Sequence, residues 1–350
     1  MSSVPAKQEP AGDTAGAPPG SMLDVTDLSV TYAADRGPVV AVDQVSFQVD
    51  SGEFLGIVGE SGCGKSTLLF AIAQLLAPPA AITGGQVSFK GRSMVGLTDR
   101  QLAAVRWKDL SVVMQSAMNA LNPVRPIRAQ FADAMRAHGV RSKTEIADRS
   151  AEVLRMVGID PVHLRSYPHQ LSGGMRQRAM IAMAMLFTPD LVIMDEPTSA
   201  LDVVAQRSLM VQIKELQQQL DFAVIFVTHD MSLISHFSDR LMVMYAGQVA
   251  EFGATRELFD RPLHPYTAGL MDAFPSIRGP RRELTGIPGS PPNLAAPPPG
   301  CRFEPRCPRA MERCASTQPE LYQVDETLVR CLLHEDGTVH QDSTGEEKTA

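Results

Sequence analysis

Residues 59–66 read Gly-Glu-Ser-Gly-Cys-Gly-Lys-Ser, which satisfies the pattern G-x-x-x-x-G-K-[ST]. The segment follows an apolar run that predicts a buried strand over 54–58 and precedes a predicted helix over 65–76. Its three glycines would let backbone N–H groups turn inward around phosphate oxygens, at the positive end of that helix. The alternative is a chance glycine-rich turn, against which the Lys-Ser pair and the flanking elements argue.

The same pattern gives individual residues their expected tasks. Lys65 would reach the β- and γ-phosphates of a nucleotide, and Ser66 would ligate Mg²⁺. Cys63 occupies a position that accepts almost any residue, so it is interpreted as a small filler; the local positive field could alternatively make it a reactive thiol. The residues expected to contact the nucleotide here are Gly59, Glu60, Ser61, Gly62, Cys63, Gly64, Lys65, Ser66 and Thr67.

Two carboxylates close a second apolar run, residues 191–194. This run predicts a buried parallel strand whose carboxyl end faces a ligand. Asp195 is then placed to hold the Mg²⁺ shell, and Glu196 to polarise the attacking water. A pair of acids at a strand end is weak evidence alone, and its weight comes from the spacing to the other motifs.

A third motif, Leu-Ser-Gly-Gly at 171–174, opens a predicted helix over 174–187. Ser172 is a natural N-cap, and Gly173 and Gly174 expose backbone donors at a positive helix end. A plain capped helix with no further task is the alternative. The motif therefore needs its neighbours in the sequence to be interpreted.

Three further side chains come at the ends of predicted strands. Tyr32 follows a strand that ends at Val30, Gln115 follows 110–114, and His229 follows 224–228. A tyrosine at a strand end is often there because of strand composition, and a lone histidine there is more often structural. These residues are interpreted as functional only because the other motifs occur in the same sequence.

In this order the motifs resemble those of ATP-binding cassette (ABC) ATPases. The resemblance implies an α/β fold, a P-loop NTPase cassette with a RecA-like core plus antiparallel β and α-helical subdomains. Residues 171–174 would be the signature motif, with Ser172, Gly173 and Gly174 contacting the γ-phosphate bound by a facing subunit. Position 175 is Met where the family usually has Gln, although some importer ATPases carry Met.

The same resemblance assigns the strand-end residues. Tyr32 would stack on adenine, Gln115 would be the Q-loop residue that contacts Mg²⁺ and water, and His229 would hold the γ-phosphate. Residues 199–202 match the D-loop that crosses a dimer interface. The catalytic set is then Lys65, Gln115, Glu196 and His229, and the Mg²⁺ ligands are Ser66, Gln115 and Asp195.

Composition agrees with one large core and a smaller appendage. The chain has 350 residues, 44% of them apolar and 20% charged, and a net charge of −7, which argues against a generally basic nucleic-acid surface. No apolar run reaches the length of a membrane span, and residues 1–21 lack a signal-peptide pattern. We expect a cytosolic chain that meets a membrane only through a partner.

Composition shifts divide the chain into four parts. Residues 1–21 are expected as a disordered tail, 22–275 as the nucleotide-binding domain with a helical subdomain over about 116–170, 276–335 as a C-terminal extension and 336–350 as a flexible tail. The subdomain is expected to contain amphipathic helices over 127–138 and 144–158, and 241–245 and 249–252 a hairpin. A proline-rich stretch at 288–300 is expected as a linker or docking arm. The sequence shows no internal repeat, which excludes a fused double cassette.

The extension holds Cys301, Cys307, Cys314 and Cys331. Clustered thiols in a cytosolic chain more often bind metal than form disulfides, but these gaps are wider than those of zinc knuckles, so spacing leaves an iron–sulfur cluster, zinc and no metal open. Four arginines interleave with the thiols and would offset an anionic cluster or form a solvated basic loop: Arg302, Arg306, Arg309 and Arg313.

A second resemblance concerns this tail. Residues 262–267 and 300–308 look like the C-terminal extension of dipeptide and oligopeptide importer ATPases, and 115–123 resemble that subfamily's sequence after the Q-loop. The extension is associated there with a 4Fe-4S cluster, so the resemblance favours a cluster on the four cysteines over zinc, as a structural clasp.

Together the two resemblances imply an ATP-hydrolysing subunit of a di- or oligopeptide importer, peripheral on the cytoplasmic face of the membrane. Its implied partners are a second cassette subunit, either a related chain or a copy of itself, two transmembrane permease subunits and an external solute-binding protein; no nucleic acid is implied. The alternatives are an importer ATPase for another solute such as a nickel chelate, a non-transport ABC ATPase, and a binding module without hydrolysis.

Overall fold

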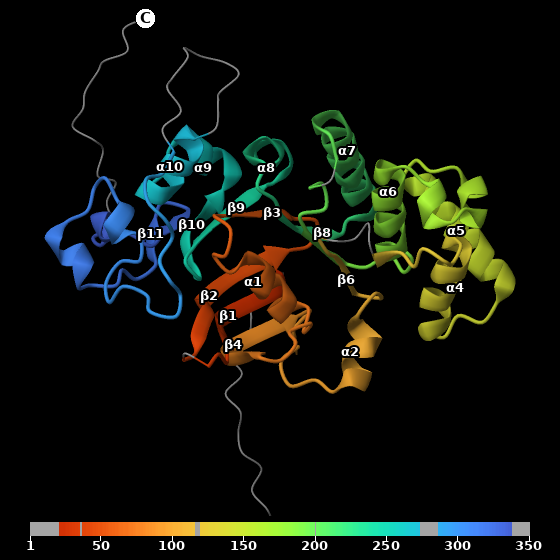
Figure 1. Ribbon diagram of the computed structural model, residues 1–350, viewed down its shortest axis with the longest axis horizontal. Helices are drawn as coiled ribbons and strands as arrows, with labels where there is room; N and C mark the ends of the chain where they lie inside the picture. The colour runs from red at the N-terminus through yellow and green to blue at the C-terminus, as the bar shows by residue number, and fades with distance from the viewer. Residues whose placement is uncertain (1–20, 36, 116–119, 200, 274–285, 338–350) are drawn as a thin grey trace, which may run out of the picture.

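The computed structural model describes residues 21–35, 37–115, 120–199, 201–273 and 286–337 (Figure 1). Most of the two expected tails, residues 116–119 after the Q-loop position and Ala200 of the expected D-loop lie outside these ranges. Ser21, expected in the N-terminal tail, is the first residue of a strand. Two sheets account for the strands of the described residues, one with four strands and one with eight.

The smaller sheet is antiparallel, with the order β2-β1-β4-β5. Its strands are β1 (Ser21–Tyr32), β2 (Val39–Asp50), β4 (Ala80–Phe89) and β5 (Arg92–Ser93). Alternate residues of β2, from Val45 through Phe47 to Val49, are buried, as expected for a sheet with one face on a core. The strand expected to end at Val30 continues to Tyr32, which pairs with Val39, so Tyr32 belongs to the strand and does not follow it.

The larger sheet has the order β11-β12-β10-β9-β3-β8-β7-β6. Its parallel strands are β6 (Leu110–Val113), β7 (Leu191–Asp195), β8 (Ala223–Val227), β3 (Phe54–Val58) and β9 (Arg240–Tyr245). Every residue of β3, β7 and β8 is buried, because both faces of the sheet are covered. The carboxyl ends of these parallel strands meet at one edge, where ligands bind in open α/β sheets.

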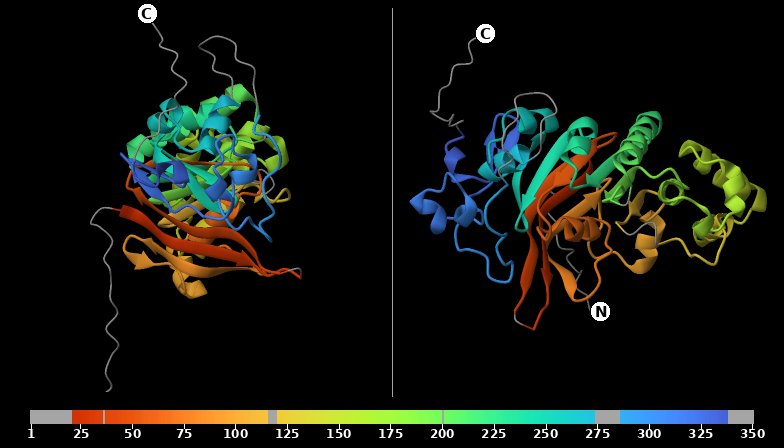
Figure 2. Two further views of the ribbon diagram at one scale, coloured as in Figure 1. Left: turned by 90° about the vertical axis from the view of Figure 1, so that its left-hand side faces the viewer. Right: turned by 45° about the horizontal axis from the view of Figure 1, so that its top comes forward.

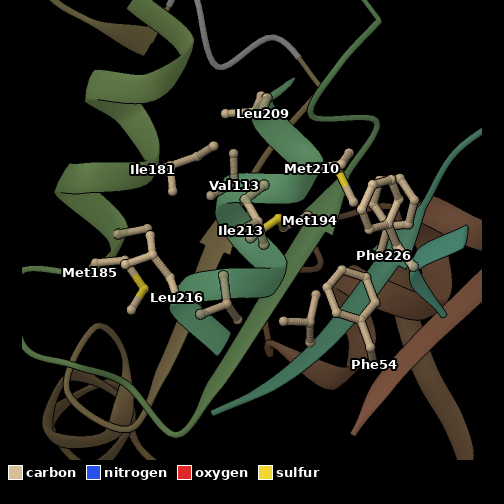
Figure 3. Close-up of a cluster of buried hydrophobic side chains, with 14 of the residues drawn as sticks. Phe54, Val113, Ile181, Met185, Met194, Leu209, Met210, Ile213, Leu216 and Phe226 are labelled. Atoms are coloured by element: carbon tan, nitrogen blue, oxygen red, sulfur yellow. The ribbon is translucent and has the colours of Figure 1, made fainter. Parts of the chain in front are cut away.

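Successive residues of the parallel strands point to two separate cores. Leu55 and Ile193 face the smaller sheet and the helix α1 (Lys65–Ile72), which lies between the two sheets (Figure 2). Phe54, Met194 and Phe226 face the opposite core (Figure 3). This core is covered by α7 (Val203–Leu220), α8 (Met231–Phe237), α9 (Thr255–Asp260) and α10 (Pro265–Asp272). The period of two along each strand thus fixes which residues belong to which core.

A helical region lies at the end of the molecule next to β6 (Figure 1). It comprises α4 (Ile127–Ala137), α5 (Lys143–Met156) and α6 (Gly173–Ala184); the short helix α2 (Asp99–Val105) precedes β6. In α4 the buried Ile127, Phe131, Ala134 and Met135 follow helical spacing, so one apolar stripe faces the core. None of the helices in the described ranges combines the length and the apolar character that a membrane span requires.

The C-terminal extension is continuous with the larger sheet, which the sequence analysis did not predict. The hairpin expected at 241–252 forms from β9 and β10 (Gln248–Ala254), and β10 then pairs with β12 (Thr327–Val329). β12 pairs in turn with β11 (Tyr322–Val324) at the sheet edge. The extension therefore shares backbone hydrogen bonds with the nucleotide-binding core.

A buried carboxylate joins β10 to the segment before α10. Glu251 is fully buried, and its two oxygens accept hydrogen bonds from the backbone N–H groups of Leu263 at 2.8 Å and His264 at 2.9 Å. Burial is the main cause that raises the pKa of Glu251 to about 7, against an ordinary value of 4.5. The protonated form of this side chain is therefore stabilised by folding.

This pKa predicts a specific pH dependence of stability. Between pH 4.5 and 7 the folded chain holds a proton at Glu251 that the unfolded chain releases, so raising the pH through this window favours unfolding. By pH 8 the free energy of unfolding should be lower by about 3 kcal/mol because of this group. Urea unfolding midpoints of the full chain at pH 5 and pH 8 measure it. Glu251→Gln, which cannot titrate, should show a smaller fall between the two pH values, and an equal fall would contradict the assignment.

Candidate functional site

The loop of residues 59–66 connects β3 to α1 at the carboxyl edge of the larger sheet. Gly59, Gly62 and Gly64 have φ values of 150°, 79° and 105°, a region that favours glycine. A Cβ atom would come within 2.2 Å of the Met244 carbonyl oxygen at Gly59, and within 2.2 Å of the Ala41 carbonyl oxygen at Gly64. Any residue with a Cβ atom is therefore excluded at both positions.

Lys65 begins α1 and folds back over the loop. Its Nζ atom donates to the carbonyl oxygens of Gly59 at 2.7 Å and Glu60 at 2.9 Å, and lies 3.6 Å from the sulfur of Cys63. Gly64 precedes the helix and no side chain caps its first turn, so the N–H donors at this positive helix end are open to an anion. The arrangement is that of a phosphate-binding loop.

The structure decides between the two interpretations of Cys63. Its side chain is buried, and burial raises the pKa of the thiol although the neighbouring Lys65 acts to lower it. The thiol is therefore held protonated, and the idea of a reactive thiolate is wrong. Its sulfur would lie 2.7 Å from a Cβ atom at Gly59, so Cys63 fills space within the loop.

Asp195 ends β7 directly beside Ser66. Asp195 is 3% exposed, and the Ser66 hydroxyl lies close enough to its carboxylate to act on its pKa. Burial raises the pKa of Asp195, and the charge of Glu196 raises it further, while Ser66, Lys65 and His229 act in the opposite direction. A hydroxyl and a carboxylate side by side are hard oxygen donors, the set that Mg²⁺ takes together with phosphate oxygens and water, so these residues fit the ion.

Glu196 is the centre of a second group of side chains. One carboxylate oxygen lies 2.5 Å from Nε2 of His229, and the other accepts a hydrogen bond from the Gln115 amide. Glu196 itself has φ 47°, a left-handed backbone conformation. Residues other than glycine rarely adopt it, and it is enriched at functional sites. Three strand ends that are distant in the sequence thus bring one acid, one imidazole and one amide together.

These groups line one cleft of about 420 Å³. The Tyr32 hydroxyl lies 3.1 Å from the Thr67 hydroxyl at its rim. The residues that line the cleft are Tyr32, Val39, Ala41, Ser61, Gly62, Gly64, Lys65, Ser66, Thr67, Gln115, Glu196, His229 and Leu294. Gly59, Glu60, Cys63 and Asp195 were expected at the nucleotide but do not line the cleft.

Three of the lining residues were not predicted. Val39 and Ala41 come from β2, and Leu294 comes from the proline-rich stretch of the C-terminal extension. Each is an ordinary apolar residue, and no local pattern in the sequence distinguishes it. Glu60 turns its carboxylate to Arg306 of the extension, a contact that the sequence analysis also missed.

Residues 171–174 lie apart from this cleft. Ser172 caps α6 by accepting a hydrogen bond from the backbone N–H of Met175 at 3.2 Å, as predicted, and Ser172 is exposed. None of the residues 171–174, all of them described, lines the cleft, and a Cβ atom at Gly174 would meet the side chain of Leu201 at 3.8 Å. The described parts of one chain therefore leave this exposed helix end without a phosphate to contact.

The four cysteines of the extension lie in one neighbourhood. Burial raises the pKa of Cys301, of Cys307 and, to about 12, of Cys331, and the nearby thiols add to each shift. Within the described ranges, however, no group of three or more His, Cys, Asp or Glu side chains is placed to hold a metal ion. The described side chains thus form no metal site in this structure, and the predicted 4Fe-4S cluster is not supported.

The arginines between these cysteines differ from both expected interpretations. The side chains of Arg302 and Arg306 are 9% and 5% exposed and pair with Asp43 and Glu60 of the core, whereas Arg313 forms an exposed pair with Glu335. The interpretation as a solvated basic loop is therefore wrong for Arg302 and Arg306. Their charges are already balanced by carboxylates of the nucleotide-binding region.

Two sequence families match the chain. The ABC transporter family matches residues 42–199, and the oligopeptide/dipeptide transporter C-terminal region matches residues 250–314. The first match covers the loop over 59–66, the signature segment and the Asp195–Glu196 pair. The second begins in β10 and includes Arg302, Arg306 and three of the four cysteines.

Curated relatives and solved structures agree with these matches. The dipeptide transport ATP-binding protein DppD of Caldanaerobacter subterraneus subsp. tengcongensis is 41% identical over 319 residues, which cover 90% of this chain and 98% of that protein. The oligopeptide transport ATP-binding protein OppD of Salmonella typhimurium is 43% identical over 304 residues, which cover 86% of this chain and 90% of that protein.

Among solved structures, the ATP-binding cassette MJ0796, determined as a dimer in a post-hydrolysis state with ADP and Pi, superposes with a TM-score of 0.60. It is 29% identical, and the match covers 67% of this chain and 99% of that cassette. The antiparallel sheet, the core with its P-loop and the signature helix are thus parts of a known architecture. The chain belongs to the ABC transporter family of ATPases, and it carries the C-terminal region of the oligopeptide and dipeptide transporters.

Proposed function

We propose that the chain is the ATP-hydrolysing subunit of an importer for di- and oligopeptides. The observation that carries this proposal is the contact of Glu196 with His229 and Gln115 at the mouth of a phosphate-binding loop. The relatives named dipeptide and oligopeptide transport ATP-binding proteins support the solute class. The matched C-terminal region supports it from an independent part of the chain.

Nucleotide binding uses the positive end of α1 and the side chains around it. Lys65, which now contacts carbonyl oxygens of its own loop, turns to the β- and γ-phosphates, and Tyr32 stacks on adenine. Ser66, Asp195 and Gln115 would hold Mg²⁺, which would neutralise charge on the phosphates. Ser66 and Asp195 already lie next to each other, so these two oxygen ligands need little rearrangement.

Hydrolysis is assigned to the group around Glu196. Its carboxylate orients the attacking water, because both of its oxygens are held by His229 and Gln115 and point into the cleft. His229 then donates to the γ-phosphate, and Lys65 offsets the charge that develops on it. Gln115 links the cleft to the helical region that begins after it, the expected contact with membrane subunits.

A second cassette completes each site. Ser172, Gly173 and Gly174 form an exposed, capped helix end that does not reach the cleft of its own chain, so they serve the nucleotide of a facing cassette. The dimeric MJ0796 cassette supports this arrangement. The facing cassette is either a copy of this chain or a related chain.

Peripheral attachment to the membrane follows from the same assignment. Two transmembrane permease subunits would hold the cassette pair at the cytoplasmic face, and an external binding protein would deliver the solute. A non-transport ABC ATPase would need neither, so copurification with integral membrane subunits separates the two functions. A nickel chelate is the alternative solute, and the uptake experiment below includes it.

Glu196→Gln tests the hydrolytic assignment. The variant keeps the shape of the side chain but removes the carboxylate, so the turnover of the assembled complex should fall by about 10²-fold or more while ATP still binds. Steady-state phosphate release and nucleotide binding measure the two properties. Glu326→Gln, an exposed acid in the turn between β11 and β12, is the matched control and should hydrolyse ATP at the normal rate. Hydrolysis that persists in Glu196→Gln would show that the role is wrong.

Uptake by intact cells tests the transport function. Cells of the source organism that lack this chain should lose uptake of a labelled dipeptide but keep uptake of the free amino acid. Wild-type chain should restore uptake and Glu196→Gln should not, because transport depends on hydrolysis. Loss of labelled nickel chelate uptake with normal dipeptide uptake would correct the solute and leave the ATPase assignment intact.

The 4Fe-4S cluster stays a prediction that rests on the resemblance of residues 300–308, and no step above depends on it. Its test is the iron and acid-labile sulfide content of full chain purified without oxygen. About four of each per chain, lost in a Cys301→Ser/Cys307→Ser variant, is the result that the prediction requires. Iron at background level, or zinc near one per chain, would show the prediction wrong.

A further inference from the structure

The C-terminal arm is the segment of residues 286–306, which runs from the described start of the extension to the residue before Cys307. Figures 1 and 2 show this part of the chain passing beside β2, the strand that borders the nucleotide cleft. The arm is distant from the cleft in sequence, and no family motif places it at the nucleotide. Two of its side chains nevertheless reach the cleft or the loop that forms it.

Arg306 binds the phosphate-binding loop directly. Its two terminal nitrogens donate to the two carboxylate oxygens of Glu60 at 2.7 Å and 2.8 Å, a bidentate pair, and the Arg306 side chain is 5% exposed. The same guanidinium donates to the Tyr245 hydroxyl at 3.2 Å and to the Pro288 carbonyl oxygen at 2.7 Å. Arg306 therefore ties the loop, β9 and the arm together, with a geometry that lysine cannot reproduce.

The contact continues from Glu60 to the lysine that binds phosphate. The Glu60 backbone N–H donates to the Tyr266 hydroxyl at 2.9 Å, and its carbonyl oxygen accepts from Nζ of Lys65 at 2.9 Å. Glu60 is thus held by side chain and backbone on one side and contacts Lys65 on the other. A displacement of Glu60 would move the loop that positions Lys65.

Charge gives this contact a second consequence. Glu60 places a carboxylate in a loop whose ligand is a polyanion, so an unpaired Glu60 would repel the phosphates. The buried guanidinium offsets that charge at contact distance, and the hydrogen bonds to Glu60 are the first cause that raises the pKa of Arg306. The arginine partner therefore offsets the charge of an acidic residue in a loop that binds an anion.

Leu294 brings the arm to the other end of the cleft. It lines the cleft together with Tyr32, Val39 and Ala41, the apolar part of the wall. The turn that carries it is fixed by Asn293, whose side chain accepts from the backbone N–H of Ala295 at 3.0 Å. An apolar wall beside Tyr32 suits the flat face of a nucleobase and contributes nothing to phosphate binding.

A second arginine, Arg302, anchors the arm beside the cleft. The Arg302 side chain, 9% exposed, donates to the Asp43 carboxylate on β2 and to the Ala246 carbonyl oxygen directly after β9. Because Val39 and Ala41 lie on the same strand as Asp43, this contact fixes the arm relative to the wall that Leu294 extends.

We propose that the C-terminal arm completes the nucleotide site of its own chain. Arg306 is a positioning residue that holds the phosphate-binding loop through Glu60, and Leu294 forms part of the wall that receives the nucleobase. The proposal goes beyond the assigned function, because it concerns how ATP is held and is independent of the solute that the complex carries.

The test of Arg306 compares nucleotide affinity in four full-length chains. We expect Arg306→Met to weaken binding of the non-hydrolysable analogue AMP-PNP with Mg²⁺ by about tenfold, because the Glu60 carboxylate is left uncompensated. Adding Glu60→Gln to that variant removes the repelling charge and should recover most of the affinity. Arg313→Met, which breaks an exposed ion pair within the same extension, is the matched control and should bind normally. Isothermal calorimetry gives each dissociation constant.

A second ligand distinguishes the effect of Arg306 on phosphate binding from the effect of Leu294 on nucleobase binding. Inorganic tripolyphosphate carries the phosphates without a base, so Arg306→Met should weaken both probes, whereas Leu294→Ser should weaken AMP-PNP and leave tripolyphosphate binding unchanged. The melting temperature of each variant is measured alongside. Unchanged affinity for AMP-PNP in both variants, with or without lower melting temperatures, would reduce the contacts to structural ones and overturn the proposal. So would a failure of Glu60→Gln to recover affinity in a folded double variant.

Discussion

The structure depends on one steric constraint, the close approach of the phosphate-binding loop to its neighbours. At Gly59 and Gly64 a Cβ atom would lie 2.2 Å from a carbonyl oxygen of another segment, Met244 at the end of β9 and Ala41 on β2. The loop is therefore packed between the two sheets and can still present backbone donors to an anion. Because its neighbours come from both sheets, the smaller sheet and the larger one must be assembled before the site exists.

The strand order explains how the remaining groups reach this loop. β3 carries the loop, and β8, β7 and β6 lie next to it in that order, each ending at the same edge. Their carboxyl ends deliver His229, the Asp195–Glu196 pair and Gln115, so segments more than a hundred residues apart meet over Lys65. Under the proposed function the loop binds the phosphates and the strand ends carry the groups for hydrolysis, a division of tasks that a parallel sheet permits.

The sequence predicted what is encoded locally and missed what is encoded by distant partners. The loop, the strands at 54–58 and 191–195 and the cap at Ser172 are each specified within about ten residues, by glycine spacing, apolar runs and a capping side chain. Arg306 and Glu60 are 246 residues apart, and nothing near either residue signals the other. Strands β11 and β12 have three residues each, too few to show a period, and they form because β10 offers an edge.

These distant contacts change the physical description of the site. Arg306 lies between two cysteines in the sequence, which suggested that its charge would offset their thiolates. In the structure its side chain is buried and its charge is balanced by Glu60 of the phosphate-binding loop. Under the two proposals above, the cassette alone lacks two parts of the site. On one side the chain's own extension supplies Arg306 and Leu294, and a continuous sheet joins this extension to the core. On the other side, under the proposed function, the capped helix end at Ser172 comes from a facing cassette, which can separate. A permanent partner suits the positioning of a loop, whereas a contact that forms and breaks suits a cycle driven by a phosphate that is bound and then removed.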